Sequence, residues 1–318
     1  MATLDIVIVD FRAGELLRTC LRSLAESPPA SVRLQRVVVV DNAPGEHSVR
    51  GSDGMGLPLE VVVNRDNRGF AAACNQGATR GTADFILFLN PDTRVVPEAL
   101  DRPVAFMERP EESGTGIVGV QLLDDDSRVA RTCYRFPHAS HFLNKALGLD
   151  RMSPTRFPNG SMSDWDHGET RQVDQVMGAF FLVRRPVFDA LGGFDERFFV
   201  YFEEVDFSLR ARRAGYRTMY LTGAHVFHSG CGTTHRLRTK RLFFSLRSRI
   251  LYGRKHFGVA PFWMLVLVSA MLEPISRLAA CFARLSWQEV SETAQAYGMF
   301  WRWLLGRDRT MRSWGGFS

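Results

Sequence analysis

The sequence has few of the cysteine patterns that stabilise small or metal-bound folds. Its five cysteines are odd in number and widely separated, and no two form a Cys-x-x-Cys pair. This argues against a disulfide framework and against a structural zinc site. The N-terminus lacks a basic patch followed by a long apolar run, so no signal peptide is expected. These absences favour a reducing, cytoplasmic location for the cysteines, which are Cys20, Cys74, Cys133, Cys231 and Cys281.

Glycine motifs that bind phosphate are also missing where they would be expected. Neither G-x-G-x-x-G nor a P-loop follows any of the predicted strands. The dinucleotide-dependent dehydrogenases and the P-loop enzymes are therefore poor descriptions of this chain.

No apolar run in the C-terminal region is long enough to span a membrane. Residues 261–272 form a 12-residue stretch without charge that Glu273 and Pro274 interrupt, whereas a spanning helix needs about 20 apolar residues. Residues 236–255 carry eight Lys or Arg residues and no acidic residue, which is typical of a basic amphipathic helix. Residues 236–285 are therefore expected to form membrane-surface or re-entrant helices. The alternatives are packing on the N-terminal domain or on a second subunit as a homodimer.

The formal charge of +6 favours an anionic partner. No recognised nucleic-acid motif accompanies the basic stretch, so no nucleic-acid partner is expected.

Short buried strands alternate with helices in the first 123 residues. The clearest strand is residues 85–89, five apolar residues followed at once by Asn90-Pro91-Asp92. Such strands are typical of a parallel sheet covered on both faces, and ligands bind beyond their carboxyl ends. Read alone, Asn-Pro-Asp is equally consistent with a turn. Several predicted strands end in polar residues at this edge, however, which predicts an α/β fold with a nucleotide-sized crevice; these residues are Asp10, Asp41, Asn64, Asn90 and Asp92.

The densest group of acids lies at the start of a predicted helix that ends near Arg213. Acids in a first turn have a simple structural role beside the helix dipole. Asp206 and Arg210 are four residues apart and are expected to form an ion pair. Glu204 has no such cation one turn on, so it is the carboxylate best placed to act as a general base.

His225 and His228 follow a predicted strand, residues 216–221, and precede Gly230. A lone histidine is more often a structural hydrogen-bonding residue than a ligand. An imidazole is nevertheless a normal ligand for manganese-type ions when carboxylates and phosphate oxygens complete the shell.

Taken together, these segments resemble glycosyltransferase family 2, in particular its bacterial rhamnosyltransferase-like members with a GT-A fold. The resemblance covers roughly residues 4–258. It rests on Ile-Val-Ile-Val-Asp-Phe-Arg at 6–12, Val-Val-Asp-Asn at 39–42, Asn-Arg-Gly-Phe-Ala-Ala-Ala-Cys-Asn at 67–75, Phe-Leu-Asn-Pro-Asp at 88–92, Gly-Ala-Phe-Phe at 178–181, Gly-Gly-Phe-Asp-Glu-Arg-Phe-Phe at 192–199, Tyr-Phe-Glu-Glu-Val-Asp at 201–206 and His-Ser-Gly at 228–230.

The resemblance implies roles for individual residues. Glu204 would be the catalytic base, with Glu203 as the neighbouring alternative, because the family's Glu-Asp pair is Glu-Glu here. Asp92 and His228 would hold a divalent metal, Mg or Mn, and Asn90 stands where the family has an aspartate. The implied donor-binding residues are Asp10, Arg12, Asp41, Asn67, Asn75 and Asn90.

The resemblance also implies a fold and a reaction. The fold is α/β, a GT-A domain at residues 1–235 with a mostly parallel sheet, followed by a helical region at residues 236–318. Residues 1–120 would bind the nucleotide sugar and residues 121–235 would supply the acceptor side and the base.

The expected activity is inverting transfer of a sugar, first L-rhamnose from dTDP-rhamnose, to a hydroxyl of a glycan or polyprenyl-diphosphate-linked acceptor. This would serve surface polysaccharide synthesis at the cytoplasmic face of the inner membrane. The alternative is a non-catalytic module of the same fold that binds nucleotide sugar or polysaccharide.

Overall fold

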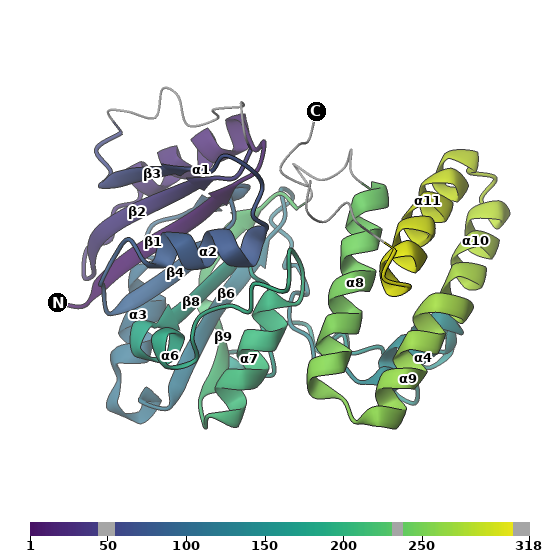
Figure 1. Ribbon diagram of the computed structural model, residues 1–318. Helices are drawn as coiled ribbons and strands as arrows, with labels where there is room; N and C mark the ends of the chain where they lie inside the picture. The colour runs from purple at the N-terminus through teal and green to yellow at the C-terminus, as the bar shows by residue number, and fades with distance from the viewer. Residues whose placement is uncertain (44–54, 231–237, 308–318) are drawn as a thin grey trace.

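A computed structural model describes residues 1–43, 55–230 and 238–307. Cys231 and the first residue of the basic stretch, Arg236, lie outside the described residues. Figure 1 shows two parts side by side, a sheet with helices on both faces and a bundle of long C-terminal helices.

One sheet of nine strands organises the first part, in the order β3-β2-β1-β4-β8-β6-β9-β5, with β7 paired to β9. The strands are β1 (Thr3–Asp10), β2 (Arg33–Asp41), β3 (Leu59–Val63), β4 (Phe85–Leu89), β5 (Thr93–Val95), β6 (Thr115–Leu123), β7 (Arg171–Val173), β8 (Phe180–Arg184) and β9 (Arg217–His228).

The N-terminal half of the sheet is parallel, and the sheet as a whole is mixed. β1 pairs in parallel with β2 and with β4, and β2 with β3. β8 runs antiparallel to β4 and β6. The antiparallel strand β8 interrupts the parallel pattern after β4, although β6 and β9 again pair in parallel. The α/β fold class is therefore confirmed, with a mixed sheet.

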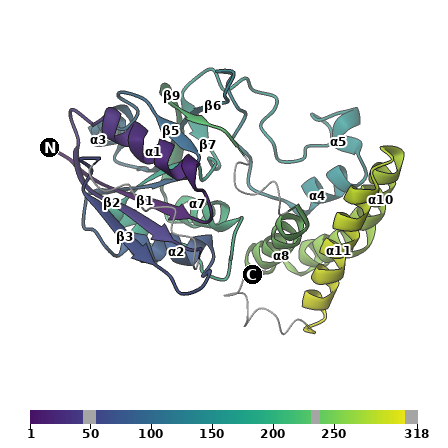
Figure 2. The ribbon, with the colours of Figure 1, turned by 90° about the horizontal axis from the view of Figure 1, so that it is seen from above.

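Helices cover both faces of this sheet (Figure 2). Because β1 is buried on both faces, its side chains alternate between two cores. Ile6 and Ile8 pack with α1 and α3, while Val7 and Val9 pack with α2, α6 and α7. These helices are α1 (Glu15–Glu26), α2 (Phe70–Ala78), α3 (Asp101–Glu108), α6 (Arg185–Ala190) and α7 (Glu203–Arg213), and a 3₁₀ turn covers Pro110–Glu112.

Two segments differ from the sequence-based expectation. The region at 124–171 appears irregular in sequence, yet it contains α4 (Ala139–Ala146) and α5 (Leu149–Met152). Ala139 and Phe142 of α4 pack against the C-terminal helices, so long-range packing stabilises a helix too short to be recognised from periodicity. The strand expected at 216–221 continues to His228 because β6 and β5 both pair with its second half.

The second part consists of α8 (Arg238–His256), α9 (Val259–Leu267), a π turn (Val268–Leu272), α10 (Glu273–Ala283) and α11 (Trp287–Leu304). From Val259 to Ala283 the chain is one helix of 25 residues, which is long and apolar enough to cross a membrane by length and composition. The break expected at Glu273-Pro274 is therefore wrong.

The helix continues through Pro274 because its lost hydrogen bond is replaced. Proline has no N–H to donate to the carbonyl four residues earlier, which here belongs to Ala270. The indole Nε1 of Trp301 in α11 donates to that carbonyl at 3.0 Å.

Candidate active site

A cavity of about 420 Å³ opens beyond the carboxyl ends of β1 and β4. This is where ligands bind in open α/β sheets. Residues from the sheet, from the first turn of α7 and from α8 surround it. Its polar and charged lining residues are Asn42, Asn67, Asn90, Asp92, Tyr201, Glu203, Glu204, His228, Lys240 and Arg241.

Strand pairing brings Asp92 to His228. The short strand β5 begins at Thr93, which pairs with His228 at the end of β9. Asp92 precedes Thr93, and its Oδ1 lies 3.2 Å from the His228 Nε2. The two side chains are 10% and 14% exposed, respectively, so they form a nearly buried polar pair in the cavity wall.

A network of amides shapes the wall formed by the β2 and β3 ends. The Asn42 Nδ2 donates to Asn67 Oδ1 at 2.9 Å, and Asn64 Nδ2 donates to Asn42 Oδ1 at 3.1 Å. Asn67 in turn accepts a hydrogen bond from the Gly69 N–H at 2.9 Å. Gly69 has φ of +86°, and a Cβ there would stand 2.5 Å from the Phe199 carbonyl oxygen. Glycine is therefore required where α2 begins against residue 199.

Glu203 and Glu204 bring two carboxylates into an apolar part of the cavity. The Oε2 atoms of both are buried without a hydrogen-bond partner among the described residues. Burial raises the pKa of Glu204 above its ordinary value. Burial also raises the pKa of Glu203, and the neighbouring Glu204 charge raises it further. Glu203 is 5% exposed, whereas Glu204 is less buried, so Glu204 is the carboxylate that a substrate can reach more easily.

The turn that presents these two glutamates is strained. Tyr201 and Phe202 have φ of +69° and +72°, and a left-handed conformation costs a residue with a Cβ roughly 1–2 kcal/mol. Such strain persists only where the surrounding structure holds it, and it is frequent at functional sites.

One face of α8 holds that turn in place. Phe244 stacks on Phe199 with ring centroids 4.8 Å apart, and the Ser248 hydroxyl donates to the Val200 carbonyl at 2.8 Å. Tyr252 packs on Phe202 with centroids 5.5 Å apart. Because Phe244, Ser248 and Tyr252 follow one another at intervals of four, a single helix face supports the turn that presents Glu203 and Glu204.

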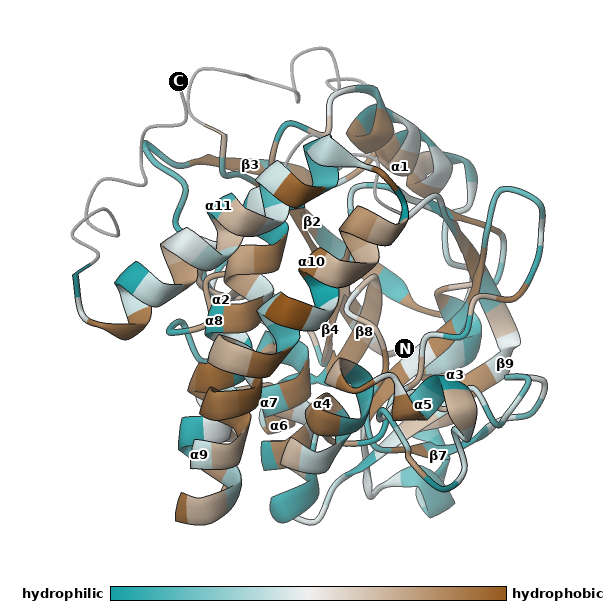
Figure 3. Cartoon of the chain, turned by 90° about the vertical axis from the view of Figure 1, so that its right-hand side faces the viewer, coloured by the Kyte–Doolittle hydropathy of each residue, from teal (hydrophilic) through white to brown (hydrophobic). Residues whose placement is uncertain are grey.

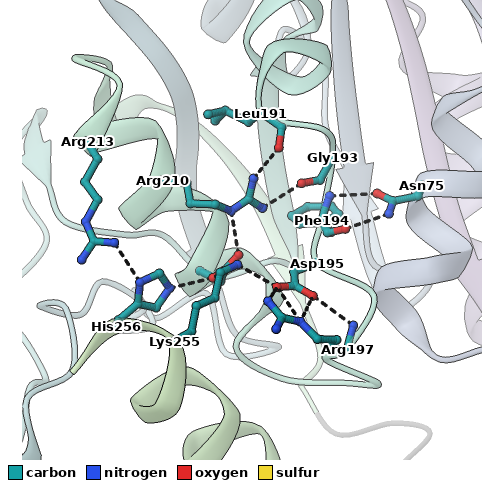
Figure 4. Close-up of polar contacts among 11 residues, drawn as sticks. Asn75, Leu191, Gly193, Phe194, Asp195, Arg197, Arg210, Arg213, Lys255 and His256 are labelled. Atoms are coloured by element: carbon teal, nitrogen blue, oxygen red, sulfur yellow. Dashed lines mark hydrogen bonds and ion pairs between the residues drawn. The ribbon is translucent and has the colours of Figure 1, made fainter. Parts of the chain in front are cut away.

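The same face ends in an ionic cluster around Asp206, and its partners Arg210, Lys255 and His256 are labelled in Figure 4. The carboxylate accepts hydrogen bonds from Lys255 Nζ at 2.7 Å and Arg210 Nε at 2.8 Å, and the His256 Nε2 lies 2.7 Å from it. Lys255 also contacts Asp195 at 2.7 Å. Burial alone would raise the pKa of Asp206, yet His256, Lys255 and Arg210 hold it below its ordinary value. The ion pair expected between Asp206 and Arg210 is confirmed, and the cluster joins α7 to α8.

The structure brings six of the residues identified from the sequence into one cavity: Asn67, Asn90, Asp92, Glu203, Glu204 and His228. Asp10 and Asp41 lie beside it, paired at the ends of β1 and β2, and each accepts a hydrogen bond from a loop N–H, of Ala13 and Ala43 respectively. Arg12 does not line the cavity, but its charge is close enough to Lys240 to help lower the pKa of that lysine.

Asn75 does not line the cavity either. Its side-chain amide pairs with the backbone of Phe194, donating to the carbonyl at 2.8 Å and accepting from the N–H at 2.9 Å. This bidentate contact fixes the segment that leads to residue 199. The structure thus gives Asn75 a positioning role, in contrast to the donor contact expected from the sequence.

Sequence reasoning missed the contribution of α8 to this cavity. Lys240, Arg241 and Phe244 line it, whereas the sequence favoured a membrane surface for the basic stretch and gave packing on the N-terminal domain only as an alternative. Burial and the neighbouring Arg12 lower the pKa of Lys240, which reflects a concentration of positive charge. The helical spacing of Phe244 with Ser248 and Tyr252 was the signal that could have placed this face inward.

Asp92 and His228 provide a carboxylate oxygen and an imidazole nitrogen side by side. No cluster of three His, Cys, Asp or Glu side chains suited to a metal occurs within residues 1–43, 55–230 and 238–307. Magnesium and manganese commonly take only one or two protein ligands when phosphate oxygens and water complete the shell. The pair therefore fits a divalent ion that binds together with a diphosphate, and does not fit a closed site made by protein alone.

Comparisons with known proteins agree with this geometry. Residues 5–192 match the family model described as Glycosyl transferase family 2. The chain is 26% identical over 281 residues to N-acetylglucosaminyl-diphospho-decaprenol L-rhamnosyltransferase of Mycobacterium tuberculosis, covering 80% of this chain and 85% of that protein. It is 28% identical over 172 residues to the rhamnosyltransferase WbbL of Escherichia coli, covering 53% of this chain and 61% of that protein.

Solved structures show the same fold. The mannosyltransferase PcManGT of Pyrobaculum calidifontis, solved with GDP-Man and Mn2+, superposes with a TM-score of 0.56 at 16% identity, covering 96% of this chain and 88% of that chain. Residues 1–349 of TarS from S. aureus superpose with a TM-score of 0.51 at 14% identity, covering 96% and 93%. These similarities establish a GT-A-like α/β architecture.

Proposed function

Since this chain belongs to glycosyl transferase family 2 and is a glycosyltransferase, we propose that it transfers a sugar with inversion from a nucleotide diphosphate donor to a hydroxyl group of a lipid-linked glycan. The first candidate donor is dTDP-L-rhamnose, because two relatives are named as rhamnosyltransferases. The observation that carries the proposal is the placement of Glu204, whose Oε2 is buried without a hydrogen-bond partner among the described residues, in the same cavity as Asp92 and His228.

The donor occupies the cavity with its base toward the β1 and β2 ends and its diphosphate toward Asp92. Asp41 and the Asn42–Asn67 network lie at the base and ribose end. Asn90 has a side-chain amide that suits a ribose or phosphate oxygen. Lys240 and Arg241 bring positive charge from α8 to the diphosphate, and charge-assisted hydrogen bonds to phosphate are stronger than neutral ones.

The chemical step forms one bond and breaks another. The acceptor oxygen bonds to the anomeric carbon while the bond from that carbon to the diphosphate oxygen breaks, and the anomeric configuration inverts. Glu204 takes the proton from the acceptor hydroxyl. Burial raises its pKa, and a carboxylate with a raised pKa binds the transferred proton more strongly than an ordinary glutamate does.

The leaving nucleotide gains negative charge in this step. Lys240 and Arg241 are placed to stabilise that charge. A divalent ion held by Asp92 and His228 would supply further positive charge to the diphosphate.

The acceptor is proposed to be a glycan carried on a polyprenyl diphosphate, which requires a protein at a membrane surface. The relative from Mycobacterium tuberculosis is named for such an acceptor. In this chain an exposed apolar stripe follows the helix from residue 259 to 283 at intervals of mostly four residues: Val259, Trp263, Leu267, Met271, Ile275 and Phe282. Residues 236–285 are therefore proposed to rest on the cytoplasmic face of the inner membrane, with the GT-A domain of residues 1–235 beside it.

The test compares Glu204→Gln with Glu203→Gln, a matched change at the neighbouring carboxylate. Transfer from dTDP-L-rhamnose is measured with a lipid-linked N-acetylglucosamine acceptor, and donor binding is measured by calorimetry. Loss of a general base should lower kcat by about 10²–10⁴-fold, with donor affinity retained, and Glu203→Gln should have a much smaller effect. Near-normal turnover in Glu204→Gln would remove the base assignment.

A further inference from the structure

A second cavity, of about 520 Å³, lies among the helices of the C-terminal part. We call it the helical cavity. Segments of α4, α5, α8, α10 and α11 enclose it, and it shares no lining residue with the candidate active site. Its size falls within the range of small-molecule sites in proteins.

Positive charge dominates the lining of the helical cavity. Three carboxylates, Glu273, Glu289 and Glu292, also line it, but twice as many cations do. The cations are Lys145, Arg151, Arg238, Arg249, Arg277 and Arg284. A concave surface with this imbalance favours an anionic ligand.

The carboxylates hold the arginine side chains in position but are too few to neutralise the positive charge of the lining. Glu273 accepts hydrogen bonds from Arg249 at 2.5 Å and from Arg277 at 2.8 Å. Glu289 pairs with Arg284 at 2.8 Å. Guanidinium groups anchored in this way form a preorganised set of donors, which suits the oxygens of a phosphate group.

Donors are left over for a ligand. The Arg249 side chain is 9% exposed, yet its Nε has no hydrogen-bond partner among the described residues. A buried N–H without a partner is unfavourable, and an anion in the cavity would satisfy it. Lys145 and Arg151 are exposed lining residues, and no carboxylate within the described part of the chain pairs with either.

Helix α10 separates this cavity from the exposed apolar stripe. Ser276, Arg277, Ala280 and Arg284 face the cavity, while Ile275 and Phe282 are exposed. At 100° per residue the two sets lie on opposite sides of the helix. Figure 3 shows hydrophobic and hydrophilic residues alternating along α10 in this way.

We propose that the helical cavity binds the phosphate group of a membrane lipid headgroup. The proposal rests on the membrane-surface association proposed above for residues 236–285. With the stripe in contact with the apolar part of the bilayer, the cavity lies within one helix diameter, roughly 10–12 Å, of the depth at which lipid phosphates occur. The site would hold the protein at a fixed depth and orientation on the membrane.

The test uses flotation of the full chain with vesicles of phosphatidylcholine alone and of phosphatidylcholine containing phosphatidic acid, at fixed physiological salt. Wild type should bind the phosphatidic acid vesicles about tenfold more tightly. Lys145→Ala/Arg151→Ala should lose most of that preference, since these exposed residues can be replaced without unfolding the chain. Arg18→Ala/Arg22→Ala on α1 removes the same charge far from the cavity and should keep the preference.

Further experiments distinguish a lipid phosphate from a soluble phosphate as the ligand. They also test the cavity site separately from the membrane association. Leu267→Glu should reduce binding to both kinds of vesicle if the stripe contacts lipid, so a failure of the membrane association is seen independently of the cavity. Equal loss of preference in the cavity and α1 variants would overturn the cavity site. Calorimetry with soluble pyrophosphate tests the source of the phosphate. If wild type binds pyrophosphate, the cavity variant does not, and wild type shows no preference between the two kinds of vesicle, then the ligand is not a lipid phosphate.

Discussion

Glu204 and Asp206 are two residues apart in the first turn of α7. The surroundings of the two carboxyl groups shift their pKa values in opposite directions. Glu204 points into the cavity, where burial raises its pKa and its Oε2 has no partner. Asp206 points toward α8, where His256, Lys255 and Arg210 outweigh the effect of burial and lower its pKa. Their helix and its dipole are shared, so the environment alone makes the difference.

The comparison separates Glu204, the proposed base, from Asp206, a residue with a structural role. The Oε2 of Glu204 is buried without a hydrogen-bond partner among the described residues, which costs stability but leaves that oxygen able to accept a proton. His256, Lys255 and Arg210 hold the Asp206 carboxylate and lower its pKa, and these contacts join α7 to α8 across the two parts of the molecule.

Asp206→Asn is expected to have the largest effect on stability. Removing one member of a buried ionic cluster costs about 3–5 kcal/mol, and we expect the lower end because Lys255 keeps Asp195 as a partner. Thermal and urea unfolding measure the loss. Asp126→Asn is the control, since its pair with Arg128 is exposed. A change below about 1 kcal/mol in Asp206→Asn, as expected of an exposed pair, would show that the cluster does not stabilise the α7–α8 contact.

Arg241→Ala is expected to weaken donor binding. A hydrogen bond to a charged group contributes about 1.5–3 kcal/mol, so the dissociation constant for the nucleotide sugar should rise by about tenfold or more. Calorimetry with dTDP-L-rhamnose measures the change. Arg254→Ala removes a cation from the exposed end of α8 and should leave donor affinity unchanged. Equal affinities in both variants would remove α8 from the donor site.

Glu204→Gln should increase stability, opposite in sign to Asp206→Asn. Because the folded-state pKa of Glu204 is raised, its charged form is disfavoured by folding and stability falls as pH rises through the interval above its ordinary pKa. Removing that charge should add about 0.5–2 kcal/mol at neutral pH, measured as a higher unfolding midpoint. A lower midpoint would mean that Glu204 has a stabilising partner.

Particular residues show how far the sequence alone could lead. The buried strand at residues 85–89 and the polar residues after it predicted both the fold and the edge where the site lies, because an apolar run and its abrupt end are local signals. Asn75 lies in the same sequence segment as Asn67, so both residues had the same expected role from the sequence. Only the tertiary contact with Phe194 shows that Asn75 has a positioning role. The role of α8 depends on which face of this basic helix packs against the rest of the protein. Because Lys and Arg residues are spread along α8, the sequence alone did not identify that face.

Glu273-Pro274 illustrates the same limit. The dipeptide predicts a helix break from local chemistry, and the partner that prevents the break, Trp301, lies 31 residues from the carbonyl it satisfies. Local rules therefore predicted the N-terminal strands and the edge where the candidate site lies, whereas α4 and the joining of the two parts depended on contacts between residues distant in sequence.

The most direct test of the central claim is the pH dependence of kcat/KM for wild type, Glu203→Gln and Glu204→Gln. A base with a raised pKa must lose activity as pH falls through that pKa, so the acid limb should lie above the range of an ordinary glutamate in wild type and in Glu203→Gln. The residual activity of Glu204→Gln should show no such limb. An acid limb that persists unchanged in Glu204→Gln would contradict the assignment of Glu204 as the base.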